Sequence, residues 1–204
     1  HPDGDAAGTR DAAPSALAAA RECVTTAREL AGRRGLRDMV GASLAVRRAV
    51  RIDPGYVEAW VLLANIAVLR VNRGQIAAAS VGLRRADWAI RRALAVDPAA
   101  DGALALRGWI RTVVAGDTAA GLADLGRALA LNGESWITHA HLGWALHAAG
   151  RPDEGLAAFE AMTRLNPLAT FSAGLYGYAL ACSGRLAEAL ALLDSAARTM
   201  PNVD

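Results

Sequence analysis

Three histidines, His139, His141 and His147, lie close together in the sequence and are the first candidates for metal chemistry. A helix presents two metal ligands on one face when they are four residues apart. The separations here are two, six and eight residues, so no pair has that spacing. We therefore expect these side chains to serve in packing or to make a groove more polar, and we predict no metal site and no cofactor.

A catalytic serine or cysteine needs a neighbouring base and a third group that orients the base. Ser172, Cys182 and Ser183 have no histidine within the same 34-residue stretch of the chain, and the sequence contains no Gly-x-Ser-x-Gly motif. The glycine clusters fall where helices are expected to end, so they do not indicate a phosphate-binding loop. The sequence therefore predicts that the protein is not an enzyme.

Aromatic side chains recur along the chain at a regular spacing. Trp109, Trp144 and Tyr178 are separated by 35 and 34 residues. Aromatic rings give binding energy with few rotatable bonds to freeze, so one such ring per repeat suits an extended peptide, an apolar helix or a flat ligand. The alternative is that the rings only cover neighbouring helices. Asn65 falls at the equivalent position one copy earlier, and Thr112 and His147 follow Trp109 and Trp144 by three residues.

These spacings reflect an internal repeat of 34 residues in the last third of the chain. Residues 150–157 overlay residues 184–191, and Leu142-Gly143-Trp144 overlays Tyr176-Gly177-Tyr178. A fixed period of this length is typical of solenoids built from helix pairs. Abundant alanine and leucine with few β-branched runs also favour helices over strands. We therefore expect an all-α fold.

The periodicity predicts ten helices, and two insertions interrupt it. Ten extra residues fall around 72–96 and predict an elongated helix that ends at Val96. One extra residue near Gly116-Asp117 is expected to adjust a loop. The expected helices cover about 15–34, 37–52, 56–72, 75–96, 100–115, 118–131, 135–149, 152–165, 169–183 and 186–199.

The repeats resemble the tetratricopeptide repeat, whose signature runs W-x2-L-G-x2-Y, then A-x3-F, then P. Leu142-Gly143-x2-Leu146 with Gly155-x3-Phe159 carries the resemblance in one copy. Tyr176-Gly177-x2-Leu180 with Ala189-x3-Leu193 carries it in the next. The copy that begins at Arg107-Gly108-x2-Arg111 departs from the signature at both arginines.

The resemblance covers about residues 20–201 and implies a right-handed superhelical α-solenoid of about five antiparallel helix pairs. We place the repeat domain at 15–204 and interpret residues 1–14 as a flexible linker or a remnant of processing or cloning. The pairs are expected at about 15–54, 55–98, 99–133, 134–167 and 168–201.

Resemblance to this family implies a non-catalytic module that holds a peptide or protein partner in a concave groove, which is lined by the inner helix of each pair. The partner-binding residues that the resemblance implies are Asn65, Trp109, Thr112, Trp144, His147 and Tyr178. A finer resemblance, over residues 59–131, is to the repeat domains attached to bacterial winged-helix transcription activators and to some nucleotide cyclases. It implies an alternative function, in which the groove binds a small molecule and reports it to an attached regulator. A thermal-shift screen with metabolites would separate the two.

The charge pattern bears on other classes of partner. All 22 basic residues are arginines, and 20 acidic residues leave a net charge of +2. Because the charges are mixed along the chain, we expect no nucleic-acid binding. The pairs Arg47-Arg48 and Arg84-Arg85 are interpreted as solvated helix faces. The composition indicates a bacterial protein, either cytoplasmic or periplasmic.

The longest uncharged stretch, Leu165 to Gly184, follows the repeat and contains proline and glycine, so we expect no membrane insertion. Repeat arrays normally finish with a polar helix. Leu190 and Leu193 make the last helix apolar instead, which predicts either a homo-oligomer through this face or a removed segment that covered it. Cys23 and Cys182 are expected to be unbridged and buried.

Overall fold

The computed structural model describes residues 15–33, 35–72, 79–166 and 170–199. Within these ranges the chain forms ten α-helices and one short π-helical turn, η1, and no strand. The segment 1–14, expected to be a flexible linker or a remnant of processing or cloning, lies outside the described residues. The helices are α1 Ala16–Arg33, α2 Leu36–Ile52, α3 Val57–Asn72, α4 Ala79–Val96, α5 Asp101–Trp109, α6 Thr118–Leu131, α7 Trp136–Ala148, α8 Pro152–Leu165, α9 Thr170–Cys182 and α10 Leu186–Thr199, with η1 at Ile110–Val114.

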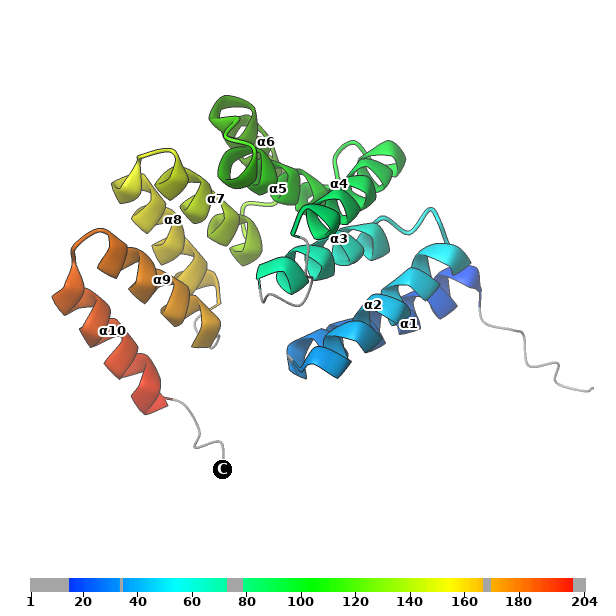
Figure 1. Cartoon of the computed structure of the whole chain (residues 1–204), viewed down its shortest axis with the longest axis horizontal. Helices are drawn as coiled ribbons and strands as arrows, with labels where there is room; N and C mark the ends of the chain where they lie inside the picture. Colours follow the sequence, from blue (N-terminus) through cyan, green and yellow to red (C-terminus); the bar gives the residue numbers. More distant parts are fainter. Residues whose placement is uncertain (1–14, 34, 73–78, 167–169, 200–204) are drawn as a thin grey trace, which may run out of the picture.

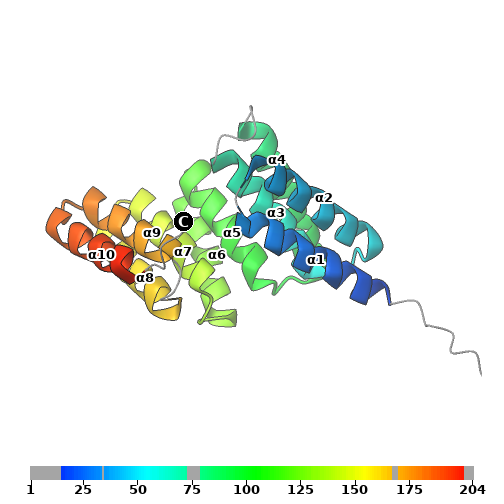
Figure 2. The ribbon, with the colours of Figure 1, turned by 90° about the horizontal axis from the view of Figure 1, so that it is seen from below.

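The helices pack as antiparallel pairs that follow one another in a curved row, shown in Figure 1 from α1 and α2 in blue to α10 in red. The second helix of each pair also contacts the first helix of the next pair. In both views α1 and α10 lie at opposite ends of the molecule (Figures 1 and 2). The expected all-α solenoid of about five antiparallel helix pairs is confirmed.

Glycines set the short distance between the two helices of a pair. A Cβ atom added to Gly143 of α7 would lie 2.7 Å from the ring of Phe159 in α8. In the preceding pair, a Cβ atom on Gly121 of α6 would lie 2.7 Å from the carbonyl oxygen of Gly108 in α5. Because real Cβ contacts are not this short, these positions have room only for a hydrogen atom. The helix pairs therefore pack at native density only with glycine there.

The single-residue insertion in the third pair is accommodated differently from our expectation. We placed it in the loop near Gly116-Asp117, but the chain forms a π-helical turn at Ile110–Val114, directly after Trp109. The Ala115 N–H donates to the carbonyl oxygen of Ile110 at 3.0 Å, a bond that spans five residues instead of four. A π turn takes up one extra residue within a helix. The insertion therefore changes the helix beside Trp109.

Helix α4 is long, as expected. It has 18 residues, against 14 in each of α6, α8 and α10. It begins at Ala79, and residues 73–78, where we placed part of the insertion, lie outside the described residues. Cys23 and Cys182 are both free thiols, but Cys182 is exposed, so its expected burial was wrong.

Candidate functional site

The inner side of the curved row contains a groove with a volume of about 650 Å³. Its wall is built from α1, α3, α5, η1, α7 and α9, so residues far apart in the sequence meet there. Val68, Leu69, Ile137 and Leu175 provide much of the apolar surface. No residue of the lining is an aspartate, glutamate, lysine or arginine, and the groove is therefore apolar and uncharged apart from any charge on His141.

A row of aromatic rings follows the groove from α5 to α9. The centroid of the Trp109 ring lies 6.1 Å from that of His141, and the Trp144 centroid lies 5.6 Å from that of Tyr178. Trp144 also packs its ring edgewise on the buried Phe159, with 5.2 Å between centroids. Trp109 and Trp144 are half-buried and border the groove, so each covers a neighbouring helix and also presents surface to the groove.

Asn65 and Tyr178 lie at the two ends of this arrangement. Asn65 of α3 lines the groove, and its side-chain amide makes no hydrogen bond within the described part of the chain. Tyr178 of α9 is 59% exposed and extends the aromatic row beyond the enclosed part of the groove. An amide can both donate to and accept from the main chain of a bound peptide.

The structure places two of the expected groove residues inside the helix packing. Thr112 is buried, and its hydroxyl donates to the Gly108 carbonyl at 3.1 Å. His147 packs edgewise on Trp144 and Phe159. Both side chains contact the second helix of their pair: a Cβ atom added to Gly121 of α6 would lie 2.0 Å from Oγ1 of Thr112, and one added to Gly155 of α8 would lie 3.0 Å from Nδ1 of His147.

His141 is a groove residue that was not among the expected partner-binding residues. We expected the three histidines to serve in packing or to make a groove more polar, and the His141 ring lies beside Trp109. Desolvation by burial lowers the pKa of His141 to about 4. Its Nδ1 atom is enclosed and has no hydrogen-bond partner among the described residues. The imidazole is therefore neutral near pH 7, and the groove carries no charge.

Trp136 and Ile137 also line the groove and were not predicted. They precede Ala140, His141 and Trp144 on α7, and together these residues form the helix face that is directed at the groove. Ile137, Ala140, His141 and Trp144 recur at separations of three and four residues, which is typical of side chains on one side of a helix. This spacing was the signal in the sequence that could have identified them.

The three clustered histidines lie in three different environments. The Nε2 atom of His139 lies 3.0 Å from the Gly133 carbonyl oxygen, His141 borders the groove and His147 lies within the helix packing. Across residues 15–33, 35–72, 79–166 and 170–199, no three histidine, cysteine or acidic side chains are grouped so that they could hold a metal ion. Among the helices of these ranges, none has both the length and the apolar character needed to cross a bilayer.

Comparison with known proteins shows which fold this is. No protein-family model matches the chain, and no curated protein matches it. Among solved structures, it is similar to TTC0263, a thermophilic TPR protein of Thermus thermophilus, with a TM-score of 0.72 and 19% identity over 91% of this chain and 93% of that one.

Two further structures are similar over most of the chain. PilW, described as a widely conserved type IV pilus biogenesis factor, has a TM-score of 0.64 at 17% identity, covering 89% of this chain and 79% of that one. Pseudomonas aeruginosa PilF has a TM-score of 0.59 at 20% identity, covering 90% and 78%. Together these similarities show that the chain has the tetratricopeptide-repeat fold.

Proposed function

We propose that the protein is a non-catalytic interaction module that holds an apolar, uncharged peptide segment of a partner protein in its concave groove. The observation that carries this proposal is the row of aromatic rings along an uncharged groove. Extended concave surfaces are the binding surfaces that helical solenoids generally use. The tetratricopeptide-repeat fold supports the same class of function.

The chemistry of the groove defines the peptide that it would accept. A charged side chain that entered would lose hydration and find no opposite charge, which is unfavourable. Apolar and aromatic side chains would gain contacts with Trp109, Trp144 and Leu175. The free amide of Asn65 is available to hydrogen-bond the peptide main chain. An uncharged segment with large apolar residues is therefore the best fit.

Peptide display followed by affinity measurement tests the proposal. Peptides selected from a random library on the full chain should be rich in apolar residues and poor in charged ones. Trp109→Ala should lower the affinity for a selected peptide about 30-fold or more, as substitutions at interface hot spots do. Because Trp144 also packs on Phe159, Tyr178→Ala is the safer second variant.

Trp88→Ala is the matched control, because Trp88 does not line the groove. Circular dichroism should show that every variant remains folded. If Trp109→Ala and Tyr178→Ala are folded and bind the selected peptides as the wild type does, the groove is not the binding site. Selected peptides that are mainly charged would contradict the proposed chemistry.

The volume of the groove favours a second candidate function, the binding of a small molecule for an attached regulator. About 650 Å³ lies within the range typical of small-molecule sites, about 300–1,000 Å³. An uncharged apolar metabolite would then occupy the space beside Trp109 and His141. A metabolite at 100 times its Kd should stabilise the fold by about 2.7 kcal/mol, which a thermal-shift screen would detect. A peptide that binds while no metabolite raises the Tm would favour the interaction module.

A further inference from the structure

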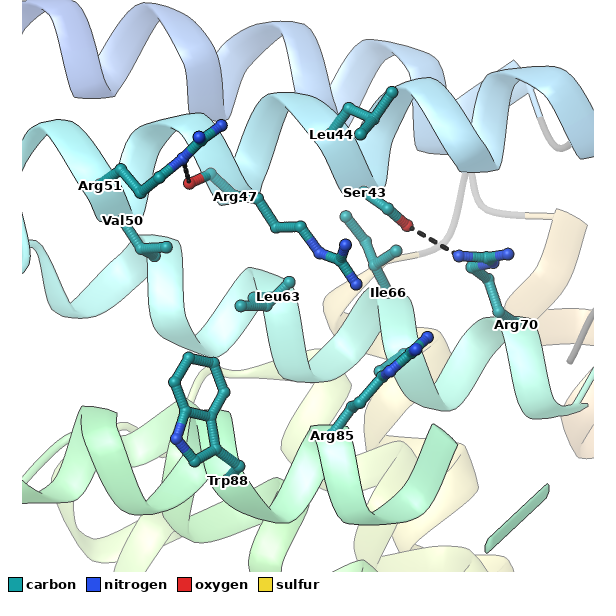
Figure 3. Close-up of a pocket in the computed structure, with 11 residues that line it drawn as sticks. Ser43, Leu44, Arg47, Val50, Arg51, Leu63, Ile66, Arg70, Arg85 and Trp88 are labelled. Carbon is teal, nitrogen blue, oxygen red and sulfur yellow. Dashed lines mark hydrogen bonds between the residues drawn. The ribbon is translucent and has the colours of Figure 1, made fainter. Parts of the chain in front are cut away.

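A second cavity, of about 490 Å³, lies on the side of α3 that faces away from the groove (Figure 3). Leu63 and Ile66 of α3 form its floor, Leu44 of α2 borders it on one side and Trp88 of α4 on the other. Trp88 is 48% exposed although it packs against Trp60, so one part of its indole ring is free. Helix α3 thus separates an uncharged groove from a cavity of different chemistry.

Four arginines from three helices line this cavity: Arg47 and Arg51 of α2, Arg70 of α3 and Arg85 of α4. Figure 3 shows the guanidinium groups of Arg47, Arg70 and Arg85 around Ile66, with that of Arg70 turned towards Ser43. No acidic residue lines the cavity. Within the described part of the chain, none of these arginines has a carboxylate at ion-pair distance, whereas other arginines of the protein do.

Arg70 is held in place by the protein itself. Its Nη1 donates to the hydroxyl of Ser43 at 3.3 Å, and that buried hydroxyl donates to the Met39 carbonyl at 2.9 Å. This hydrogen bond holds the Arg70 guanidinium group at the wall of the cavity.

The presence of several guanidinium groups around one cavity without an acidic residue indicates a multiply charged anion. Like charges at short range repel one another, and an anion between them converts that repulsion into attraction. Guanidinium groups bind phosphate and carboxylate through paired hydrogen bonds. A carboxylate carries one negative charge, whereas a phosphate ester carries about 1.5 to 2 near neutral pH, which better matches three cations.

The rest of the cavity indicates what the phosphate is attached to. The volume lies within the range typical of small-molecule sites, about 300–1,000 Å³. Leu44, Leu63 and the free part of Trp88 provide an apolar wall beside the arginines. We propose that this cavity binds a small phosphorylated molecule with a flat apolar body, with the phosphate between Arg47, Arg70 and Arg85 and the body against Trp88.

The chain contains matched controls for this site. In the pair Arg47-Arg48 only Arg47 lines the cavity, and in the pair Arg84-Arg85 only Arg85 does. All four side chains are exposed and lie on helices α2 and α4. Replacement of either member of a pair by glutamine therefore removes the same charge from nearly the same place, but only one replacement removes a cavity donor.

Calorimetric titration of the full chain with 1-naphthyl phosphate tests the proposal, at about pH 7.5, where the phosphate is mainly a dianion. We expect saturable binding, and binding of 1-naphthol that is weaker by about tenfold or more, because 1-naphthol lacks the charged hydrogen bonds. Inorganic phosphate should also bind more weakly. Arg47→Gln and Arg85→Gln should each weaken binding about tenfold, and Arg48→Gln and Arg84→Gln less than about twofold.

Several outcomes would overturn the proposal. One is the absence of saturable binding of 1-naphthyl phosphate to the folded wild type. Another is an equal loss of affinity in the cavity variants and in their neighbouring controls, which would indicate general charge attraction. Equal affinity for inorganic phosphate would contradict the apolar wall and leave an adventitious ion only. Much tighter binding of a phosphoserine peptide would show that the ligand is a protein segment and not a small molecule.

Discussion

Asp124 of α6 accepts two hydrogen bonds from Arg107 of α5, from its Nε and Nη2 atoms, each at 2.7 Å. Arg111 of η1 adds a third, from its Nη1 atom, also at 2.7 Å. Asp124 is only 4% exposed, so both arginines neutralise a buried carboxylate. Arg107 and Arg111 are the positions at which this repeat departs from the tetratricopeptide signature, and their shared partner on the second helix explains the departure.

Asp124→Ala should lower the free energy of unfolding by about 3 kcal/mol, because loss of one partner leaves charged groups of a largely buried ion pair uncompensated. Urea denaturation measures the change. Asp194→Ala is the control: Asp194 pairs with Arg198 on the exposed surface of α10, and its loss should cost at most about 0.5 kcal/mol. Equal destabilisation by the two variants would contradict the structural role of Asp124.

Two glycines of α6 should respond oppositely to alanine. A Cβ atom on Gly121 would lie 2.0 Å from Oγ1 of Thr112, whereas one on Gly126 would meet nothing within 4 Å. Gly121→Ala should therefore destabilise the fold by about 1–3 kcal/mol through overpacking. Gly126→Ala should stabilise it by up to about 1 kcal/mol, because alanine favours the helix. Thermal or urea unfolding of the two variants gives the sign, and a stable Gly121→Ala would show that α5 and α6 are not closely packed.

The stability of the fold should decrease at mildly acidic pH because of His141. Its pKa is lowered by desolvation to about 4, whereas a histidine in the unfolded chain has a pKa of about 6.5. Above about pH 6.5 the His141 imidazole is neutral in both the folded and the unfolded state, so it does not change the free energy of unfolding. Below that value the unfolded chain takes up the proton first, so the free energy of unfolding falls, by about 2 kcal/mol at pH 5 and by about 3 kcal/mol once pH reaches 4.

His141→Gln isolates this effect, because all other titrating groups are present in both proteins. Urea denaturation at about pH 7 and about pH 5 should show a smaller loss of stability in His141→Gln than in the wild type, by about 2 kcal/mol. The same loss in both proteins would mean that His141 is accessible to protons in the folded state.

Self-association through the apolar face of α10 is one of the two explanations that the sequence leaves for this face, and it can be tested directly. Leu186, Leu190 and Leu193 are exposed along one side of the helix, and Leu190 is 68% exposed. Exposed apolar surface of this kind often marks an interface. Sedimentation should show association of the wild type and a monomer for Leu190→Glu, while Val96→Glu, an exposed position on α4, should behave as the wild type does. A wild type that stays monomeric at high concentration would exclude this interface.

Much of the fold could be predicted from local patterns. The 34-residue period, the apolar spacing and the glycines at helix ends were sufficient to predict ten helices, and most bounds agree with the structure within one or two residues. Gly150 and Gly184 have positive φ angles of 73° and 78°, as expected for glycines that end helices. These features depend on neighbours within a few residues, so they are readable from a single sequence.

The candidate sites could be predicted only in part. Spacing alone placed Trp109 and Trp144 at equivalent positions, but it could not show that Thr112 and His147 turn towards the second helix. Nor could it show that Arg47 and Arg85, 38 residues apart, are directed at one cavity while Arg48 and Arg84 are not. These arrangements depend on how far each helix is rotated about its axis and on which helices meet. Such properties arise from packing between distant segments, and the periodicity of the sequence contains no measure of them.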